Sequence, residues 1–451
     1  MPQKAYLYIL KGGILASFVS FLLVFDTLLF PYITSKQIYF NILIELLLVV
    51  WVAFVVKYPQ WRPSLSWISK GLLAYFAVIL ASCFISVDFN LSFWGDIERM
   101  LGAFHLFHFL IFYFILITVM REWKDWRLLF ITSLVFTLIV SIKGIAGTPH
   151  STIGNKAYVA GLLIFNIYFA LMLFAKDLRN VSRRVPTAYL PWLYLLPLPF
   201  YLWAFVRQDI TGAKAGLALS VLAAAFLILF LDKRRWVSRG AVALAVVGVI
   251  AVGVVTVAKS EQIGNYFASQ DTFQTRLVAW QGAWEQLPEH PLLGTGHGTF
   301  AITFDQTFDA DFYNHVMKGA TYFDRAHNNL IGIFSTKGVL GGFTYLFIFA
   351  AALYYLVVKY REGRIDRFIF SLLVALLIGY FVQNLSVFDS LVTYVSIMSL
   401  LAFVHWLSFH EDTGETRKLF AVTGGKKLTD KEIFSWLGVG VVMIIIIYQF
   451  N

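Results

Sequence analysis

Long apolar runs recur along almost the whole of this 451-residue chain, and they limit its fold more than any other feature. A run of roughly 20 apolar residues is the length of an α-helix that crosses the hydrocarbon core of a bilayer. Hydrophobic residues make up 59% of the chain and charged residues only 14%, which is outside the range of soluble domains. We therefore expect an all-α, polytopic integral membrane protein.

Counting on this length predicts about 12 to 13 transmembrane helices. The first run lacks a cleavage site of small residues, so we interpret it as a retained helix and not as a removed signal peptide. No repeat array or low-complexity tract divides the chain, so we expect a single membrane domain over residues 1–451, in which 410–451 hold a polar segment and the last hydrophobic span. The predicted spans are 8–30, 37–56, 68–87, 101–120, 128–147, 157–175, 188–206, 213–231, 240–258, 330–358, 368–388, 391–409 and 433–449.

Lys and Arg residues are distributed unevenly between the predicted loops. If the N-terminus is cytoplasmic, the inner segments hold 25 of the 36 Lys and Arg residues, and the outer segments hold 15 of the 26 acidic residues. Short loops rich in Lys and Arg stay on the cytoplasmic side. The bias predicts that the long loop at 259–329 faces outward. The formal net charge of +10 is then a topology signal and requires no nucleic-acid partner.

The long loop carries the signals of short helices. An Asp with Gln three residues later marks a helix start at residue 271, and Pro288 ends that helix. Its apolar stripe with two tryptophans suits a helix that lies in the membrane interface. A Gly-rich turn follows, and three phenylalanines four residues apart predict a second short interfacial helix. The stripe is Leu277, Trp280, Trp284 and Leu287, and the phenylalanines are Phe300, Phe304 and Phe308.

The apolar pattern after the loop runs from His327 to Lys359, which is too long for one straight span. We expect a break at Lys337–Gly338 or at Gly341–Gly342. A short helix that begins near Asn328 would then point its amide groups at the region beside His327, as broken membrane helices do where they bind anions.

The residues of this region form a recurring pattern. An Arg is followed by a Trp-containing helix, then by P-L-L-G-x-G-x-x-x-F, an outward loop, and an H-N pair with G-x-x-G downstream. Together they resemble the O-antigen ligase and O-antigen polymerase superfamily of bacterial envelope glycan assembly. Two earlier stretches, F-W-G-D-I-E-R-M-L-G and I-G-N-K-A-Y-V-A-G-L-L, also resemble landmarks of that family. The matching positions are Arg99, Asn155, Arg276, Trp280, 291–294, Gly296, Phe300, His327, Asn328, Gly338 and Gly341.

The resemblance implies transfer of a glycan from undecaprenyl diphosphate to an acceptor hydroxyl, such as one of the lipid A core, at the periplasmic face of the bacterial inner membrane. The implied partners are the undecaprenyl-diphosphate-linked glycan donor, the lipid A core or another glycan acceptor, and membrane lipid. Members use a histidine and two outer arginines. His327 and Arg276 match as catalytic residues, but the second arginine is replaced by Lys214 in T-G-A-K-A-G, a point charge without the bidentate fork of Arg. Further candidates for diphosphate or substrate binding are Arg99, Asn328 and Asn155.

The residue types are consistent with this chemistry. A diphosphate leaving group gains negative charge as it departs, and preorganised cations stabilise that charge. A sugar hydroxyl is a poor nucleophile, and an imidazole can take its proton near neutral pH, so His327 is the candidate base. Attack opposite the diphosphate would invert the anomeric centre. No paired carboxylates or metal-ligand spacing stand out, so we expect metal-independent transfer without a cofactor.

Each candidate also has a purely structural interpretation. Arg276 would contact lipid headgroups, His327 would cap the next helix, Lys214 would be an interfacial lysine, Arg99 would pair with Asp96 or Glu98, and Asn155 would solvate a loop.

Two alternative functions remain open. A polysaccharide polymerase would use the same donor and a second lipid-linked repeat as acceptor. A lipid-linked glycan transporter belongs to a different class, and transporters place charges at the bilayer midplane between internal repeats. Here no repeat is visible and the candidate residues gather at one interface.

Overall fold

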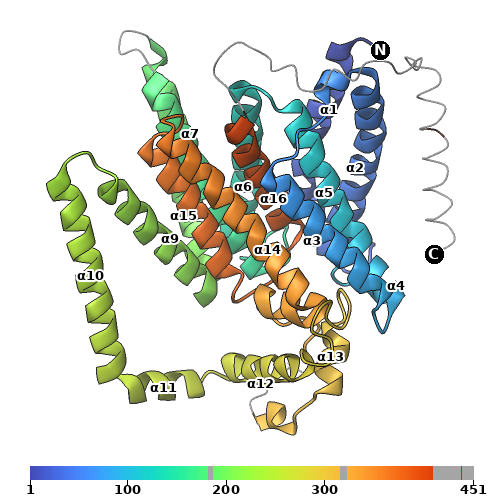
Figure 1. Cartoon of the computed structure of the whole chain (residues 1–451), viewed down its shortest axis with the longest axis vertical. Coiled ribbons are helices and arrows are strands. Elements are labelled where there is room, and N and C mark those ends of the chain that lie inside the picture. The colour runs from blue at the N-terminus through green and yellow to red at the C-terminus, as the bar shows by residue number, and fades with distance from the viewer. Residues whose placement is uncertain (181–185, 315–321, 410–437, 439–451) are drawn as a thin grey trace.

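The computed structural model describes residues 1–180, 186–314, 322–409 and 438, and these ranges contain helices and no β-strand (Figure 1). The α-helices are α1 (Gln3–Ala16), α2 (Pro31–Lys57), α3 (Trp67–Phe84), α4 (Phe89–Trp94), α5 (Ala103–Val119), α6 (Trp123–Ala146), α7 (Lys156–Asn180), α8 (Leu198–Gln208), α9 (Thr211–Phe230), α10 (Arg235–Ala258), α11 (Ser260–Ala268), α12 (Asp271–Gln286), α13 (Phe300–Gln306), α14 (Asn329–Arg361), α15 (Arg367–Gln383) and α16 (Leu391–Phe409). Short 3-10 helices lie at Ser17–Leu22, Pro59–Trp61, Pro186–Leu195 and Ala310–Asn314.

Most of the predicted spans overlap these helices, although the first, predicted at 8–30, is helical over residues 3–22. Within the described residues, nine helical segments are long and apolar enough to cross a membrane, and α5 and α15 are shorter apolar helices. The polytopic all-α prediction is thus confirmed. The predicted span at 188–206 differs, because a 3-10 helix containing Pro191 and then α8 replace a single α-helix. Proline lacks the amide hydrogen that a continuous helix needs. The predicted span at 433–449 lies outside the described residues, apart from residue 438.

The centre of the bundle is formed by α5, α7, α15 and α16, whose side chains are mostly buried. Aromatic rings join neighbouring helices there: the Phe130 ring of α6 lies 4.5 Å from that of Phe169 and 5.2 Å from that of Phe403. A polar contact crosses the same region, where Ser133 Oγ donates to Asn166 Oδ1 at 2.8 Å. Such hydrogen bonds hold helices together where lipid gives no hydrophobic driving force.

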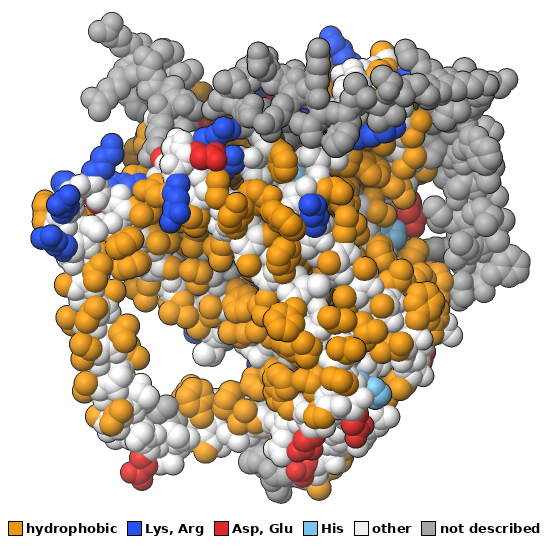
Figure 2. Space-filling model, viewed as in Figure 1, with side chains coloured by type: hydrophobic (Ala, Val, Ile, Leu, Met, Phe, Trp, Pro, Cys, Tyr) orange, Lys and Arg blue, Asp and Glu red, His pale blue; other side chains and the backbone are white. Residues whose placement is uncertain are grey.

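Helix α10 stands away from this bundle. Figure 1 shows it at the left edge, joined to the rest through α9 above and through α11 and α12 below, and Figure 2 shows open space between α10 and the other helices. Ala241 is the one buried residue within α10, and the valines, isoleucine and leucine of this helix after Ala241 are exposed. A helix that is apolar all round suits contact with lipid.

Helix α14 is broken at Gly338, where φ is 61° and ψ is −164°. This confirms the first of the two break positions predicted from the sequence. The Gly-rich turn after α12 lies in the break and forms hydrogen bonds with the backbone amides and carbonyls that the break leaves without helical partners. The hydrogen bonds are Thr295 N to Ser335 O (3.0 Å), Gly296 N to Thr336 O (3.2 Å), Val339 N to Pro291 O (2.8 Å) and Leu340 N to Leu292 O (3.2 Å).

Two glycines allow this close approach. A Cβ atom on Gly294 would lie 2.4 Å from the amide nitrogen of Lys337, and one on Gly338 would lie 2.4 Å from the carbonyl carbon of Leu292. Both glycines have positive φ, which other residues rarely adopt. The P-L-L-G-T-G motif and the break in α14 are therefore two halves of one junction, and this junction fixes the half-helix 329–337 that follows His327.

The loop helices form where the sequence predicted them, with α12 over residues 271–286 and α13 over residues 300–306. Phe300 and Phe304 are buried in a small apolar cluster with Phe312, so α13 packs against the loop itself. On α12, Ala279 and Ala283 face this cluster, while Trp284 is half exposed. Helices α12 and α13 thus pack together across one end of the bundle (Figure 1).

Candidate functional site

The predicted site residues lie at one end of the bundle, opposite to the end that carries the N-terminus (Figure 1). They come from the loop before α5, from the N-terminal ends of α7, α9 and α14, and from α12. These elements meet at the turn between α15 and α16, residues 384–390. The ring of Phe388 in this turn lies 5.4 Å from the ring of His327 and 5.5 Å from the guanidinium of Arg99.

His327 is held in a defined orientation directly before α14. Its backbone is left-handed, with φ of 50°, and its ring lies between the rings of Phe323 and Phe388. Nδ1 is 3.0 Å from the carbonyl oxygen of Arg325. A carbonyl only accepts, so Nδ1 carries the hydrogen and Nε2 of the neutral ring keeps a lone pair. The arrangement leaves Nε2 free to accept a proton.

The electrostatic surroundings keep His327 neutral. Burial lowers its pKa below the ordinary value, and the positive charge of Arg276 lowers it further, against the opposing effect of the hydrogen bond to the Arg325 carbonyl. A neutral imidazole near pH 7 is the form that a general base needs.

Arg276 lies on α12 and reaches the turn between α15 and α16. Its Nη1 donates to the carbonyl oxygen of Ser386 at 3.2 Å, and its buried Nε has no hydrogen-bond partner among the described residues. Burial lowers the pKa of this guanidinium, but an arginine stays charged at neutral pH. Arg276 therefore keeps donors that an anionic group could occupy.

Lys214 lies on the first turn of α9, beside the same turn. Gly212 approaches Ser386 so closely that an added Cβ would overlap the Ser386 hydroxyl. The Lys214 ammonium is half exposed and pairs with Asp209 at 2.5 Å. Helices α9 and α12 thus both reach Ser386, through Gly212 and Arg276, while the Lys214 ammonium itself contacts the exposed Asp209.

Arg99 is already paired with carboxylates. Its Nε donates to Asp324 at 2.7 Å and its Nη2 lies 3.0 Å from Glu98. Burial lowers the pKa of Arg99, but the hydrogen bond to Asp324 and the nearby negative charges outweigh burial and raise it overall. The sequence anticipated Glu98 as a partner but not Asp324. The pairing ties the loop before α5 to the segment before His327.

Both predicted asparagines act as helix caps. Asn328 Oδ1 accepts from the amides of Leu330 and Ile331 at 3.0 and 3.2 Å, at the start of α14. Asn155 Oδ1 accepts from the amide of Ala157 at 2.8 Å, at the start of α7. Their side-chain oxygens already accept these hydrogen bonds, so only their side-chain nitrogens (Nδ2) could contact a substrate. A substrate role for these two residues stays a prediction.

The sequence analysis missed Asp389, which organises the turn between α15 and α16. Its Oδ2 accepts from Tyr380 at 2.8 Å, from Asn384 at 3.1 Å and from Asn329 at 3.2 Å. Asn329 is the first residue of α14, and its backbone N–H also donates to the backbone carbonyl of Asn384. The available signal was a short polar string, N-L-S-V-F-D-S, with one acidic residue between two apolar runs.

A pocket opens beside His327, and Thr336 and Lys337, directly before the break in α14, line part of it. Its space measures about 60 Å³, which is room for a small group and not for a whole sugar. Any larger substrate must therefore extend out of it. Polar residues that line it are His297, Arg325, His327, Asn328, Asn329, Lys337 and Asp389.

Comparison with known families shows a match between residues 199–346 and the family described as O-antigen ligase. The matched segment contains Lys214, Arg276 and His327, whereas Arg99, Asn155 and Asp389 lie outside it. The match confirms the resemblance to the O-antigen ligase superfamily. No curated protein matches the chain significantly.

Proposed function

We propose that this protein, whose residues 199–346 match the O-antigen ligase family, is a membrane glycosyltransferase. It would move a glycan from undecaprenyl diphosphate to an acceptor hydroxyl. The family match supports a function of the O-antigen ligase or polymerase type, and within it we favour the ligase, with the lipid A core as acceptor. The single observation that carries the chemistry is His327, which the Arg325 carbonyl orients and which lies close enough to the buried guanidinium of Arg276 for that charge to lower its pKa.

In the proposed reaction, the acceptor oxygen attacks the anomeric carbon of the donor on the side opposite the diphosphate. A new C–O bond forms, the bond from carbon to the diphosphate oxygen breaks, and the anomeric centre inverts. The proton of the acceptor hydroxyl passes to Nε2 of His327. The Arg325 carbonyl then stabilises the imidazolium through Nδ1–H, as the orienting partner of a catalytic histidine does.

The leaving diphosphate carries away the bonding electrons and its charge grows. Arg276 holds a donor without a partner within the described residues, and Lys214 lies on the first turn of α9, the turn that approaches Ser386 through Gly212. Preorganised cations of this kind lower the barrier most when water is excluded. The proposed transfer is metal-independent and needs no cofactor.

We also propose that the site faces the periplasm, on the outer side of the inner membrane, with a cytoplasmic N-terminus. In Figure 2 many Lys and Arg side chains lie toward the end that carries the N-terminus, and several acidic side chains lie at the opposite end. This separation supports the orientation because basic segments stay cytoplasmic. Thiol labelling from outside intact cells at Glu289→Cys, an exposed loop position, tests it: absence of labelling would contradict a periplasmic loop.

The decisive experiment uses purified protein in lipid with an undecaprenyl-diphosphate-linked repeat, first alone and then with lipid A core. Transfer only in the presence of core would establish the ligase, and elongation without core would establish the polymerase. His327→Ala should abolish either product. His290→Ala is the matched control, because His290 is an exposed histidine of the same loop and its loss should leave the rate unchanged.

The same experiment separates the enzyme from a transporter. A transporter would move the lipid-linked glycan across the bilayer without forming a new glycosidic bond. Movement without a new bond, unchanged in His327→Ala and Arg276→Ala, would reverse the proposal.

A further inference from the structure

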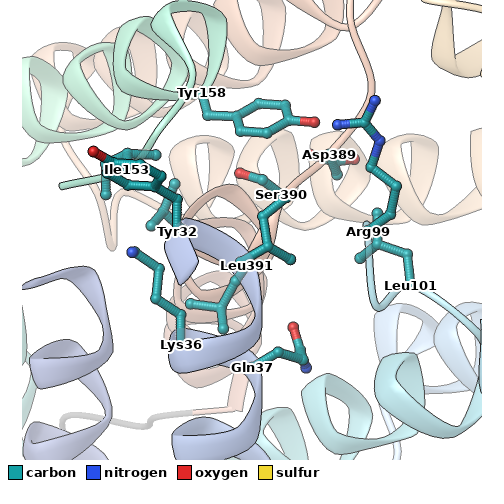
Figure 3. Close-up of a pocket in the computed structure, with 12 residues that line it drawn as sticks. Tyr32, Lys36, Gln37, Arg99, Leu101, Ile153, Tyr158, Asp389, Ser390 and Leu391 are labelled. Atoms are coloured by element: carbon teal, nitrogen blue, oxygen red, sulfur yellow. The ribbon is translucent and has the colours of Figure 1, made fainter. Parts of the chain in front are cut away.

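A second pocket lies next to the His327 pocket and shares Asp389 and Leu101 with it (Figure 3). It opens between the start of α2, the loop before α5, the start of α7 and the start of α16. Neither the proposed base nor Arg276 lines it. The polar and aromatic residues around it are Tyr32, Lys36, Gln37, Arg99, Tyr158, Asp389 and Ser390.

Two polar groups of this pocket are left without partners among the described residues. Asp389 is 3% exposed, and its Oδ1 has no hydrogen bond although its Oδ2 has three. The hydroxyl oxygen of Ser390 is also buried and unpaired. Buried polar atoms are nearly always hydrogen-bonded, so two neighbouring exceptions that line one pocket indicate that a ligand or water completes them.

Lys36 adds unused donors to the same pocket. The side chain is 3% exposed, and its Nζ donates to the Leu23 carbonyl at 2.7 Å, with the Tyr32 ring 5.8 Å away. An ammonium group has three hydrogens to donate, and the Leu23 carbonyl takes one. A lysine is rarely buried to this extent unless something pairs with it.

The pocket contains both cationic groups and a carboxylate, and this combination limits the kind of ligand it can bind. Lys36 and Arg99 would attract an anion, but the unpaired carboxylate oxygen of Asp389 would repel one. Sugar hydroxyls suit both kinds of group, because a hydroxyl can donate to a carboxylate oxygen such as Asp389 Oδ1 and can accept from an ammonium or hydroxyl group such as those of Lys36 and Ser390. The space measures about 30 Å³, which is enough for a hydroxyl-sized group and too small for a sugar ring.

We propose that this second pocket is a sugar subsite, which binds a hydroxyl group at the edge of a glycan whose reacting sugar lies beside His327. The inference rests on the proposed glycosyl transfer and adds how the glycan is recognised. The two pockets are neighbours through Asp389 and Leu101, which line both, and the Phe388 ring of the first pocket lies against His327, Arg99 and the Tyr158 ring. The sugar belongs either to the donor or to the acceptor, and the test distinguishes the two.

The kinetic test uses Ser390→Ala, because the Ser390 hydroxyl makes no hydrogen bond within the described chain and its loss should not disturb folding. The KM for the substrate whose sugar occupies the pocket should rise about threefold to tenfold, as for one lost hydrogen bond, with kcat nearly unchanged. The donor and the lipid A core are varied separately. Ser396→Ala is the matched control, since Ser396 bonds only within α16 at Val392.

A binding test works without turnover. Ser390→Cys introduces a thiol in the pocket, and the native Cys83 is buried, so wild type serves as the labelling control. Either the lipid-linked glycan or the lipid A core should slow modification of the introduced thiol by a small methanethiosulfonate. Protection without any glycan transfer would keep the subsite and reject the proposed enzyme function.

The inference is overturned if neither substrate slows labelling and both KM values for Ser390→Ala stay within twofold of wild type. The pocket would then hold water only. If the introduced thiol does not react with the reagent, the KM values alone decide, and values within twofold of wild type for both substrates overturn the inference.

Discussion

Replacing Gly338 with alanine should destabilise the protein strongly and remove its activity. Gly338 forms the break in α14 with φ of 61° and ψ of −164°, a conformation that is essentially restricted to glycine. A new Cβ atom would also lie 2.4 Å from the Leu292 carbonyl carbon. Leu292 cannot move away easily, because its carbonyl accepts from Leu340 across the break.

The two effects can be separated with a matched glycine. Gly363 has φ of 72°, but a Cβ atom there would meet nothing within 4 Å. Gly363→Ala should therefore cost only the backbone strain, about 1 kcal/mol of the free energy of unfolding. Gly338→Ala adds the overlap with backbone atoms and should cost at least about 3 kcal/mol, which is in the upper range for single substitutions.

Thermal unfolding of the purified protein in detergent or lipid measures the difference, and glycan transfer measures the consequence. The half-helix 329–337 follows His327 directly, so a disturbed junction should displace the proposed base and lower the rate more than stability alone explains. Equal shifts of the unfolding midpoint in the two variants would refute the argument from close approach. Full activity in Gly338→Ala would refute the link to His327.

The remaining predictions concern the proposed base, the cations and the caps. Burial and Arg276 lower the pKa of His327, so the base should stay deprotonated, and the rate of transfer constant, as the pH is lowered from 8. The rate should fall to half its maximum only below the ordinary histidine pKa of about 6.5. A midpoint above that value would contradict the structure. Arg276→Gln removes the repelling charge, so the midpoint measured on any remaining activity should move to higher pH. Lys214→Ala should lower the rate of transfer while Lys214→Arg keeps it, and a fully active alanine variant would exclude Lys214 from diphosphate binding. Asn328→Ala should cost about 1 kcal/mol of stability through loss of the cap, whereas Asn328→Asp keeps a capping oxygen and should remain stable; equal losses in unfolding measurements would mean that capping is not the role.

Features that depend on local sequence were predictable. An apolar run of sufficient length becomes a span because the bilayer leaves few alternatives to a helix. The start of α12 at residue 271 was predicted, although Gln270 and not Asp271 is the N-cap and its side chain makes no capping hydrogen bond. The break at Gly338 was one of two predicted positions, because glycine acts through its own backbone. Proline limited the prediction at 188–206, where a run of suitable hydropathy forms a 3-10 helix and then α8.

Partners of the site residues depended on the tertiary structure. Arg99 and Asp324 are 225 positions apart, so no local pattern could pair them. Arg276 contacts the carbonyl of Ser386, and Asp389 binds Asn329, for the same reason. The sequence by itself determined a bundle of membrane helices with a histidine and basic residues near the ends of predicted spans. Only packing decided that the turn at 384–390 joins them, because it brings together segments that the chain keeps far apart.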